Sequence, residues 1–397
     1  MKVAIIGAGV AGVGAALGLL GAGHEVEVYE QAGELRAAGN GVILWPNGTG
    51  ILREFGIDLD GLGIPMDMID SRTDDGYSLA RIKLAGVTVR YGSPTILAAR
   101  GDLLRRMADR LPEERLHFGK LCVGITEARD QVTVEFADGS EVTCDVLIGA
   151  DGHRSVVRRH LFGDRAASYT GWASWHGITS PPIELAGRNH VQSFFSGGGV
   201  CGLHPVGDGR VHWVFETPWA DGETVPRHLD GRTDSTSSIA DALRSRFGRW
   251  ASPVPELLDS IHDDDISLFP HILHEVLPRW GTERVTLAGD AVHAIPPRAA
   301  MGVNQALEDA WVLSRVLVDS GPPARQLLAY ENARRPYVER LVNRALKMER
   351  LQSRTLIKTA VWFAKRGLTF AGPRQLAIGA SSNFLSRDLP MTMRRSG

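Results

Sequence analysis

The hydrophobic positions at the amino terminus predict a strand, a helix and a second strand. Residues 3–6 are continuously apolar, which is typical of a strand buried on both faces, and residues 25–29 alternate between polar and apolar. Between them, residues 13–20 form a run of small and apolar side chains that favours a helix. This β-α-β order within about 30 residues indicates two strands that pair in a parallel sheet, with the helix packed on one face.

A different pattern occupies residues 171–269, where aromatic side chains alternate with other residues. Such alternation is typical of antiparallel strands with one buried face. A return to continuous apolar character at residues 284–287 predicts that a distant segment completes the first sheet. The other expected elements are strands at 78–91, a hairpin around Asp138-Gly139, and helices at 101–111, 241–247, 307–317, 327–350 and 358–367.

Composition narrows the class of protein. The chain has 397 residues, 43% of them hydrophobic and 23% charged, with a net charge of −2. These values are typical of a globular protein of about two to three lobes, and they provide no basic field for nucleic acid. No run reaches the roughly 18 apolar residues of an integral membrane segment, and no signal peptide is evident. Three isolated cysteines, at positions 122, 144 and 201, predict a reducing, cytoplasmic location and no metal site.

The turn after the first strand has the pattern GxGxxG, formed by Gly7, Gly9 and Gly12 with Ala11 between the last two. The first glycine permits a tight turn, the second lets a pyrophosphate approach the backbone, and the third lets helix and strand pack closely. Glu30 ends the second strand, where a carboxylate accepts hydrogen bonds from ribose hydroxyls. The motif therefore predicts a dinucleotide site. The alternative is an ordinary strand-to-helix turn with a solvated Glu30.

Two later strands also end in an acid. Asp151-Gly152 follows the apolar residues 146–150, and Asp290 follows the strand at 284–287. An aspartate at the carboxyl end of a parallel strand lies in the crevice where ligands bind. A carboxylate is unsuited to a pyrophosphate, so Asp290 is expected to accept a hydrogen bond from a ligand hydroxyl. For Asp151 the alternative is a plain turn beside a surface arginine cluster.

The three motifs in this order resemble those of the flavin-dependent aromatic hydroxylases, which are single-component FAD monooxygenases similar to p-hydroxybenzoate and salicylate hydroxylase. The resemblance extends from residue 1 to about residue 340. It implies that FAD is the cofactor, that NADH or NADPH and O2 are co-substrates, and that a C4a-hydroperoxide hydroxylates an aromatic or heteroaromatic small molecule. It also implies that the glycine turn holds the pyrophosphate, Glu30 the ribose and Asp290 the ribityl chain, while Asp151 contacts both FAD and the pyridine nucleotide.

Further positions are assigned by the resemblance alone. Arg36 and Arg100 match arginines that face FAD, and Pro297 matches the proline beside the flavin ring whose carbonyl faces the substrate. Three more match the start of a helix whose N–H groups meet the pyrimidine end of the flavin: Gly302, Val303 and Asn304.

The flavin turn departs from the family patterns at Ala299 and Met301, and a glycine is missing at position 299 or 300, which predicts a stiffer turn. The first acids after this turn are Glu308 and Asp309. They lie beyond the first helical turn, so the positive end of the helix dipole is left unneutralised.

The resemblance predicts an α/β fold with a Rossmann-like FAD-binding domain interleaved with a smaller antiparallel-sheet substrate domain and followed by C-terminal helices. The expected boundaries are residues 1–70, 100–170 and 279–340 for the FAD-binding domain, 71–99 and 171–278 for the substrate domain, and 341–397 for the C-terminal helices.

The substrate contacts are expected among the aromatic strands, although ordinary core packing is an alternative for each side chain. His204, beside Pro205, is a candidate catalytic base or a satisfied polar residue, and Pro297 is the other catalytic candidate. No arginine lies within these strands before Arg210, which favours a neutral, flat substrate. The candidate substrate contacts are Trp172, Trp175, Phe194, His204, Trp213 and Phe215.

Other functions stay open at this stage. A flavin-dependent halogenase shares the first lobe, but neither Trp172 with Trp175 nor Lys83 stands in a matching context. An isoprenoid-type reductase and a non-catalytic flavin-binding protein are further alternatives. A monomer or a homodimer is expected, and the basic helix at 358–367 is expected to pack on the first lobe, with a membrane-surface or dimer contact as the alternative.

Overall fold

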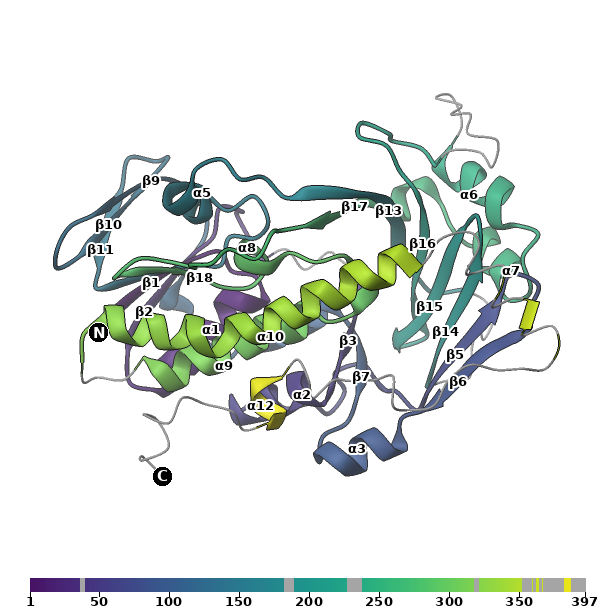
Figure 1. Cartoon of the computed structure of the whole chain (residues 1–397), viewed down its shortest axis with the longest axis horizontal. Helices are drawn as coiled ribbons and strands as arrows, with labels where there is room; N and C mark the ends of the chain where they lie inside the picture. The colour runs from purple at the N-terminus through teal and green to yellow at the C-terminus, as the bar shows by residue number, and fades with distance from the viewer. Residues whose placement is uncertain are drawn as a thin grey trace.

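The computed structural model describes residues 1–35, 40–181, 189–226, 238–317, 321–351 and 382–386, together with positions 359, 362, 363 and 366. Two sheets organise these residues, a parallel sheet and a larger, mostly antiparallel one (Figure 1). A small three-stranded sheet lies at one end of the molecule and is formed by β9 (Cys122–Glu127), β10 (Val132–Phe136) and β11 (Glu141–Cys144). Helices α6 (Ile239–Phe247) and α7 (Val254–Asp259) lie at the other end.

The parallel sheet assembles strands from distant parts of the chain. Val3, Val28 and Val146 are fully buried because helices and loops cover both faces of the sheet. Helix α1 (Val10–Gly21) follows the first strand and packs against α9 (Gly302–Val316), which in turn contacts α10 (Pro323–Leu351). The strand order is β18 (Val285–Leu287), β12 (Val146–Gly149), β1 (Lys2–Ile6), β2 (Glu25–Tyr29) and β8 (Leu116–His117).

The second sheet has seven strands and includes a hairpin that precedes the rest by about a hundred residues. The hairpin consists of β5 (Met68–Thr73) and β6 (Ser78–Lys83). Strand β5 pairs in parallel with β14 (His190–Ser196), while all other neighbouring strands in this sheet are antiparallel. The predicted interleaving of the two lobes is therefore confirmed. The strand order is β17 (Ser267–Leu273), β13 (Ser168–Thr179), β16 (Arg210–Pro218), β15 (Gly199–Gly207), β14 (His190–Ser196), β5 (Met68–Thr73) and β6 (Ser78–Lys83).

Smaller elements connect and cover the two sheets. Two three-stranded sheets are β3 (Gly41–Leu44), β7 (Ile96–Ala99) and β4 (Ile64–Pro65), and β11 (Glu141–Cys144), β10 (Val132–Phe136) and β9 (Cys122–Glu127). The remaining helices are α2 (Pro46–Glu54), α3 (Ala85–Tyr91), α4 (Arg100–Ala108), α5 (Val156–Phe162), α6 (Ile239–Phe247), α7 (Val254–Asp259), α8 (Asp290–His293) and α12 (Asn383–Ser386), with short 3-10 turns η1 (Glu113–Arg115), η2 (Asp263–Asp265) and η3 (Pro297–Ala299).

One predicted element is wrong. Residues 78–91 were expected to form strands, but β6 ends at Lys83 and α3 follows. Leu84 and Val87 are buried at helical spacing, whereas Val89 is 84% exposed, so the apolar positions mark one side of a helix. The helix ends at Gly92, whose φ of 68° is left-handed.

Most of the predicted helix at 358–367 lies outside the described residues. Within the part of the chain that the structure describes, no helix is long and apolar enough to cross a membrane.

Candidate active site

A cavity of about 1260 Å³ lies where the carboxyl ends of the parallel strands face the seven-stranded sheet. Its wall includes Gly7 after β1, Glu30 after β2, Asp151 after β12 and Asp290 after the β18 loop. Residues of β13 to β16 form the opposite side. This is the crevice in which open α/β sheets bind their ligands.

The three glycines of the first turn have different surroundings. Gly7 has a φ of 102°, and a Cβ there would lie 2.5 Å from the carbonyl oxygen of Ala150. A Cβ on Gly12 would lie 1.9 Å from the carbonyl oxygen of Gly7, so both positions are closed to a side chain. Above Gly9 the nearest atom is Nη2 of Arg100, 3.9 Å from where its Cβ would be. This open space, between the start of α1 and an arginine, fits a pyrophosphate.

Glu30 is fixed by the turn that it faces. Its carboxylate accepts hydrogen bonds from the backbone N–H of Ala8 and of Ala32, each at 2.9 Å. These bonds hold the side chain on the cavity wall, and each oxygen keeps a lone pair. The arrangement fits a carboxylate that holds ribose hydroxyls.

Asp151 combines a capping role with an unused acceptor. One oxygen accepts hydrogen bonds from the N–H groups of Val156 and Val157, at 2.7 and 3.3 Å, at the start of α5. The other oxygen is buried with no partner among the described residues. Burial raises the pKa of Asp151, because desolvation disfavours the charged form. A ligand hydroxyl or N–H group reaching this oxygen would stabilise it.

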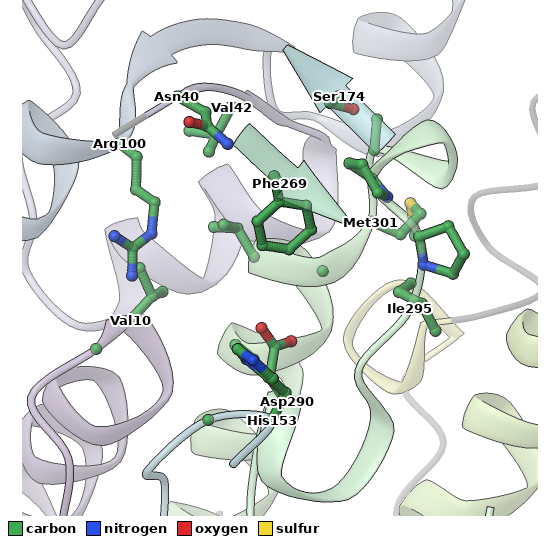
Figure 2. Close-up of a pocket in the computed structure, with 18 of the residues that line it drawn as sticks. Val10, Asn40, Val42, Arg100, His153, Ser174, Phe269, Asp290, Ile295 and Met301 are labelled. Atoms are coloured by element: carbon green, nitrogen blue, oxygen red, sulfur yellow. The ribbon is translucent and has the colours of Figure 1, made fainter. Parts of the chain in front are cut away.

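Asp290 lies near the glycine turn because the backbone before it, at Gly289, packs closely against the start of α1. The preceding Gly289 has a φ of 62°, and a Cβ there would lie 2.7 Å from Cβ of Ala11. Only glycine fits this contact between the β18 loop and α1. Asp290 then projects into the cavity beside His153 (Figure 2).

The flavin turn adopts an unusual backbone. Ala300 has a φ of 49°, a left-handed backbone conformation that residues other than glycine rarely adopt. Its carbonyl accepts hydrogen bonds from Nε1 of Trp45 at 3.0 Å and from Nδ2 of Asn304 at 3.3 Å. The missing glycine is thus at position 300, where these bonds hold the turn.

Helix α9 begins directly after this turn and presents its first N–H groups toward the cavity. Gly302 and Val303 line the cavity. The Asn304 side chain is buried beneath the cavity wall. It accepts a hydrogen bond from the backbone N–H of Trp45 at 2.9 Å and donates one to the Ile43 carbonyl at 2.8 Å. Its N–H still belongs to the first turn, whose donors have no acceptor within the helix.

The first acids of α9 turn away from the cavity. Asp309 is fully buried and accepts hydrogen bonds from Nε2 of His293 at 2.7 Å and Nε of Arg334 at 2.6 Å. Burial alone would raise the pKa of Asp309, but His293 and Arg334 lower it to about 2. Glu308 is also fully buried, where desolvation raises its pKa. The positive end of α9 therefore faces the cavity without a neighbouring carboxylate from its own helix.

The structure brings most of the predicted cofactor residues together. Arg36 lies outside the described residues. Gly12 and Asn304 support the cavity from beneath it and do not line it. The predicted residues on the cavity wall are Gly7, Gly9, Ala11, Glu30, Arg100, Asp151, Asp290, Pro297, Gly302 and Val303.

The predicted substrate contacts are placed differently, and His204 is the only one of the six on the cavity wall. Trp172 does not line the cavity, but its ring lies beneath the guanidinium of the wall residue Arg298. The other four are fully buried in a second core together with residues of α6 and α7. The prediction that these four contact the substrate is therefore wrong, because their side chains point away from the cavity. These four are Trp175, Phe194, Trp213 and Phe215.

The neighbours of these aromatic residues form the wall instead, because successive side chains of a strand point to opposite faces. A polar residue next to a buried aromatic one, as in Ser174-Trp175-His176 and His212-Trp213, was the available signal. Arg298 also lies on the wall, and the sequence analysis missed it because it comes from the flavin turn. The wall residues from β13 to β16 are Ser174, His176, Val191, Ser193, Phe195, Val200, Gly202, His204, His212, Val214 and Glu216.

Three histidines lie on neighbouring strands of this wall. Nδ1 of His204 is 3.0 Å from Nδ1 of His212, so one ring donates and the other accepts. The His176 ring centroid is 6.0 Å from that of His212. Burial lowers the pKa of both His176 and His204 to about 4, and burial together with these two neighbours lowers the pKa of His212 well below its usual value. All three are therefore neutral at pH 7.

Acid is expected to destabilise the protein through its buried histidines. Burial, with Arg298 and His176 nearby, lowers the pKa of fully buried His271 to about 3, so between pH 6.5 and 4 the unfolded residue binds a proton that the folded one does not. Stability is then lost as the pH falls through this range, by up to about 1.4 kcal/mol per pH unit for each such group. Urea unfolding of wild type and His271→Gln at pH 7, 6 and 5 tests this, and the variant should lose stability less steeply. Equal slopes would contradict the expectation.

The fold and the cavity are those of a flavin-dependent hydroxylase. The profile of the FAD binding domain family matches residues 1–345, and the chain belongs to this family. It is 34% identical over 358 residues to 3-amino-4-hydroxybenzoate 2-monooxygenase PtmB3 from Streptomyces platensis, covering 87% of this chain and 86% of that protein. It is 31% identical over 353 residues to an FAD-dependent urate hydroxylase from Klebsiella pneumoniae, covering 87% and 89%.

A solved structure shares both the fold and the cofactor class. Klebsiella pneumoniae HpxO complexed with FAD and uric acid superposes with a TM-score of 0.85 at 28% identity, covering 97% of each chain. The protein is accordingly an FAD-dependent monooxygenase of the aromatic hydroxylase class.

Proposed function

We propose that this enzyme hydroxylates an electron-rich aromatic or heteroaromatic ring, using NADH or NADPH and O2. The observation that carries the proposal is the continuity of one cavity, from the glycine turn, past Asp290 and the flavin turn, to the polar wall of β13–β16. Such a cavity holds an extended dinucleotide and, at one end, a small flat molecule. Each turnover consumes one NAD(P)H, one proton and one O2, and it yields the hydroxylated ring, NAD(P)⁺ and water.

The residues that would hold FAD follow the cavity from one end to the other. We propose that Gly9 and Arg100 hold the pyrophosphate, Glu30 the ribose and Asp290 the ribityl chain. The N–H groups of the first turn of α9 would face the pyrimidine end of the ring, where their positive dipole stabilises negative charge. Bound FAD supplies the transfer of electrons from NAD(P)H and the activation of O2. Arg36 and Asp151 are further proposed contacts of the nucleotides.

The substrate end of the cavity would handle a proton. Neutral His204, which lies on the wall bonded to His212, would accept the proton of a ring hydroxyl as the reaction proceeds, which would make the ring more electron-rich. The carbonyl of Pro297 would face the same ring. Relatives named as acting on 3-amino-4-hydroxybenzoate, urate and 6-hydroxynicotinate support a ring that carries oxygen substituents.

A screen of hydroxylated aromatic compounds tests the proposed function. The purified protein should release FAD on denaturation, and a true substrate should increase both NAD(P)H oxidation and O2 uptake while a hydroxylated product appears. His204→Gln should lower turnover about 10²- to 10⁴-fold, as expected for loss of a general base, and should retain FAD. FAD binding with no stimulation by any ring would favour a non-catalytic flavoprotein. A halogenated product in the presence of chloride would favour a halogenase.

A further inference from the structure

Arg298 is a buried cation on the cavity wall that the proposed function does not use. It belongs to η3, directly after Pro297, and only 8% of its side chain is exposed. Its Nε donates to the carboxylate of Glu216, and its guanidinium carbon lies 4.2 Å from the centre of the Trp172 ring. An ion pair on one edge and an aromatic ring on one face thus fix the plane of the guanidinium.

The remaining edge of this guanidinium has no hydrogen-bond partner within the described part of the chain. Both Nη1 and Nη2 of Arg298 are buried without a hydrogen bond among the described residues. Leaving charged donors unsatisfied in a buried position is costly, and a guanidinium cannot lower that cost by losing its proton. The two terminal nitrogens form a planar fork whose spacing matches the two oxygens of a carboxylate.

The surroundings favour an acidic group over a second cation. Glu216 is the only acid among the described wall residues of the seven-stranded sheet, and its charge is paired with Arg298. Ser174, directly opposite Glu216 in the strand register, adds a hydroxyl to the same part of the wall. The neighbouring histidines are neutral at pH 7 and so do not compete for the anion.

A purely structural role for Arg298 would account for less of the geometry. The bond from Nε and the stacking on Trp172 explain why the side chain is held in place. They leave the Nη1–Nη2 edge unused, at a position that lines the ligand cavity next to the flavin turn. A bound carboxylate would satisfy this edge.

We propose that Arg298 recognises a carboxylate on the aromatic substrate, with Glu216 and Trp172 positioning its guanidinium. The enzyme then acts on an aromatic acid, in contrast to the neutral ring that the strand sequences favoured. This inference rests on the proposed function, because it names the class of molecule that enters the same cavity.

Matched pairs of acids and amides test the proposal on the FAD-loaded enzyme. The probes are 4-hydroxybenzoate, 3-amino-4-hydroxybenzoate and 6-hydroxynicotinate, each with its carboxamide, and binding is followed by the change in flavin absorbance. Wild type should bind at least one acid about 10- to 100-fold more tightly than its amide, as expected for charge-assisted hydrogen bonds. Arg298→Gln should abolish this preference.

Two further variants keep the test decisive. Because Arg298→Gln removes the ion-pair partner of the buried Glu216 carboxylate, the double variant with Glu216→Gln provides a neutral wall, and it should also bind acid and amide equally. Arg249→Gln removes an exposed arginine that does not line the cavity, and it should keep the wild-type preference.

The outcomes separate this inference from the proposed function. Equal binding of acid and amide in every pair, no binding of any acid, or an acid preference that survives in the Arg298 variants would overturn the inference. Stimulation of O2 uptake by the amides alone would overturn it while supporting the proposed function. Tight binding of an acid that depends on Arg298, without any stimulated oxidation or product, would support the inference and contradict the proposed function.

Discussion

Replacing Arg334 with methionine is expected to lower the free energy of unfolding by about 3–5 kcal/mol, the usual effect of breaking a buried ion pair from one side. The Arg334 side chain is fully buried and donates to Asp309 at 2.6 Å, to Asn383 at 2.9 Å and to the Gln305 side chain at 2.8 Å. Its loss leaves the Asp309 carboxylate in the core with fewer donors. The same carboxylate accepts from the N–H of Gly289 at 2.8 Å, so the loop before Asp290 should loosen as well.

Denaturant unfolding of the FAD-loaded enzyme measures this effect, and the next residue along the helix is its control. Arg335 has a side chain that is 31% exposed and lies 3.7 Å from each of two glutamates. Its pair with Glu339 is exposed and contributes about 0–1 kcal/mol, and its own guanidinium is not enclosed in the core, so Arg335→Met should lower stability much less than Arg334→Met. Similar losses in the two variants would show that the buried network is not what stabilises α9 against α10.

Replacing Asp290 with alanine is expected to weaken FAD binding by about 2–4 kcal/mol, which raises the dissociation constant about 30- to 700-fold. The reason is its position: Gly289 packs on Ala11, and the carboxylate then projects into the cavity (Figure 2). Within the described part of the chain, no hydrogen bond to another residue holds this side chain, so its acceptors are available to the ligand.

Titration of apoprotein with FAD measures the change, and two variants bracket it. Asp290→Asn keeps an acceptor oxygen but loses the charge, and it should give an intermediate dissociation constant. Asp264→Ala, at an exposed position away from the cavity, should match wild type. FAD affinity that is unchanged in Asp290→Ala would remove this residue from the cofactor site.

Local signals in the sequence were sufficient for the cofactor half of the cavity. The roles of Gly7 and Gly12 depend on contacts within one turn and the adjacent strand, which the motif itself encodes. Glu30, Asp151 and Asp290 each follow a strand directly, and parallel strands place their carboxyl ends at one edge. Strand order could therefore vary in detail without changing where these acids lie. The strand expected at residues 85–91 failed because the buried positions, Leu84 and Val87, are three residues apart and lie on one side of a helix, whereas Val89 is exposed.

The substrate half was decided by the tertiary structure. Alternation in β13 to β16 shows that these strands have two faces, but both Trp175 and its neighbour His176 are buried, and only the packing of α6 and α7 selects the aromatic face for the core. Arg298 reaches Glu216 from a turn 82 residues away along the chain. The sequence by itself determined the fold class and the cofactor turn, because those depend on near neighbours. The face proposed to meet the substrate, and the cation on it, depend on contacts between distant segments that no local pattern records.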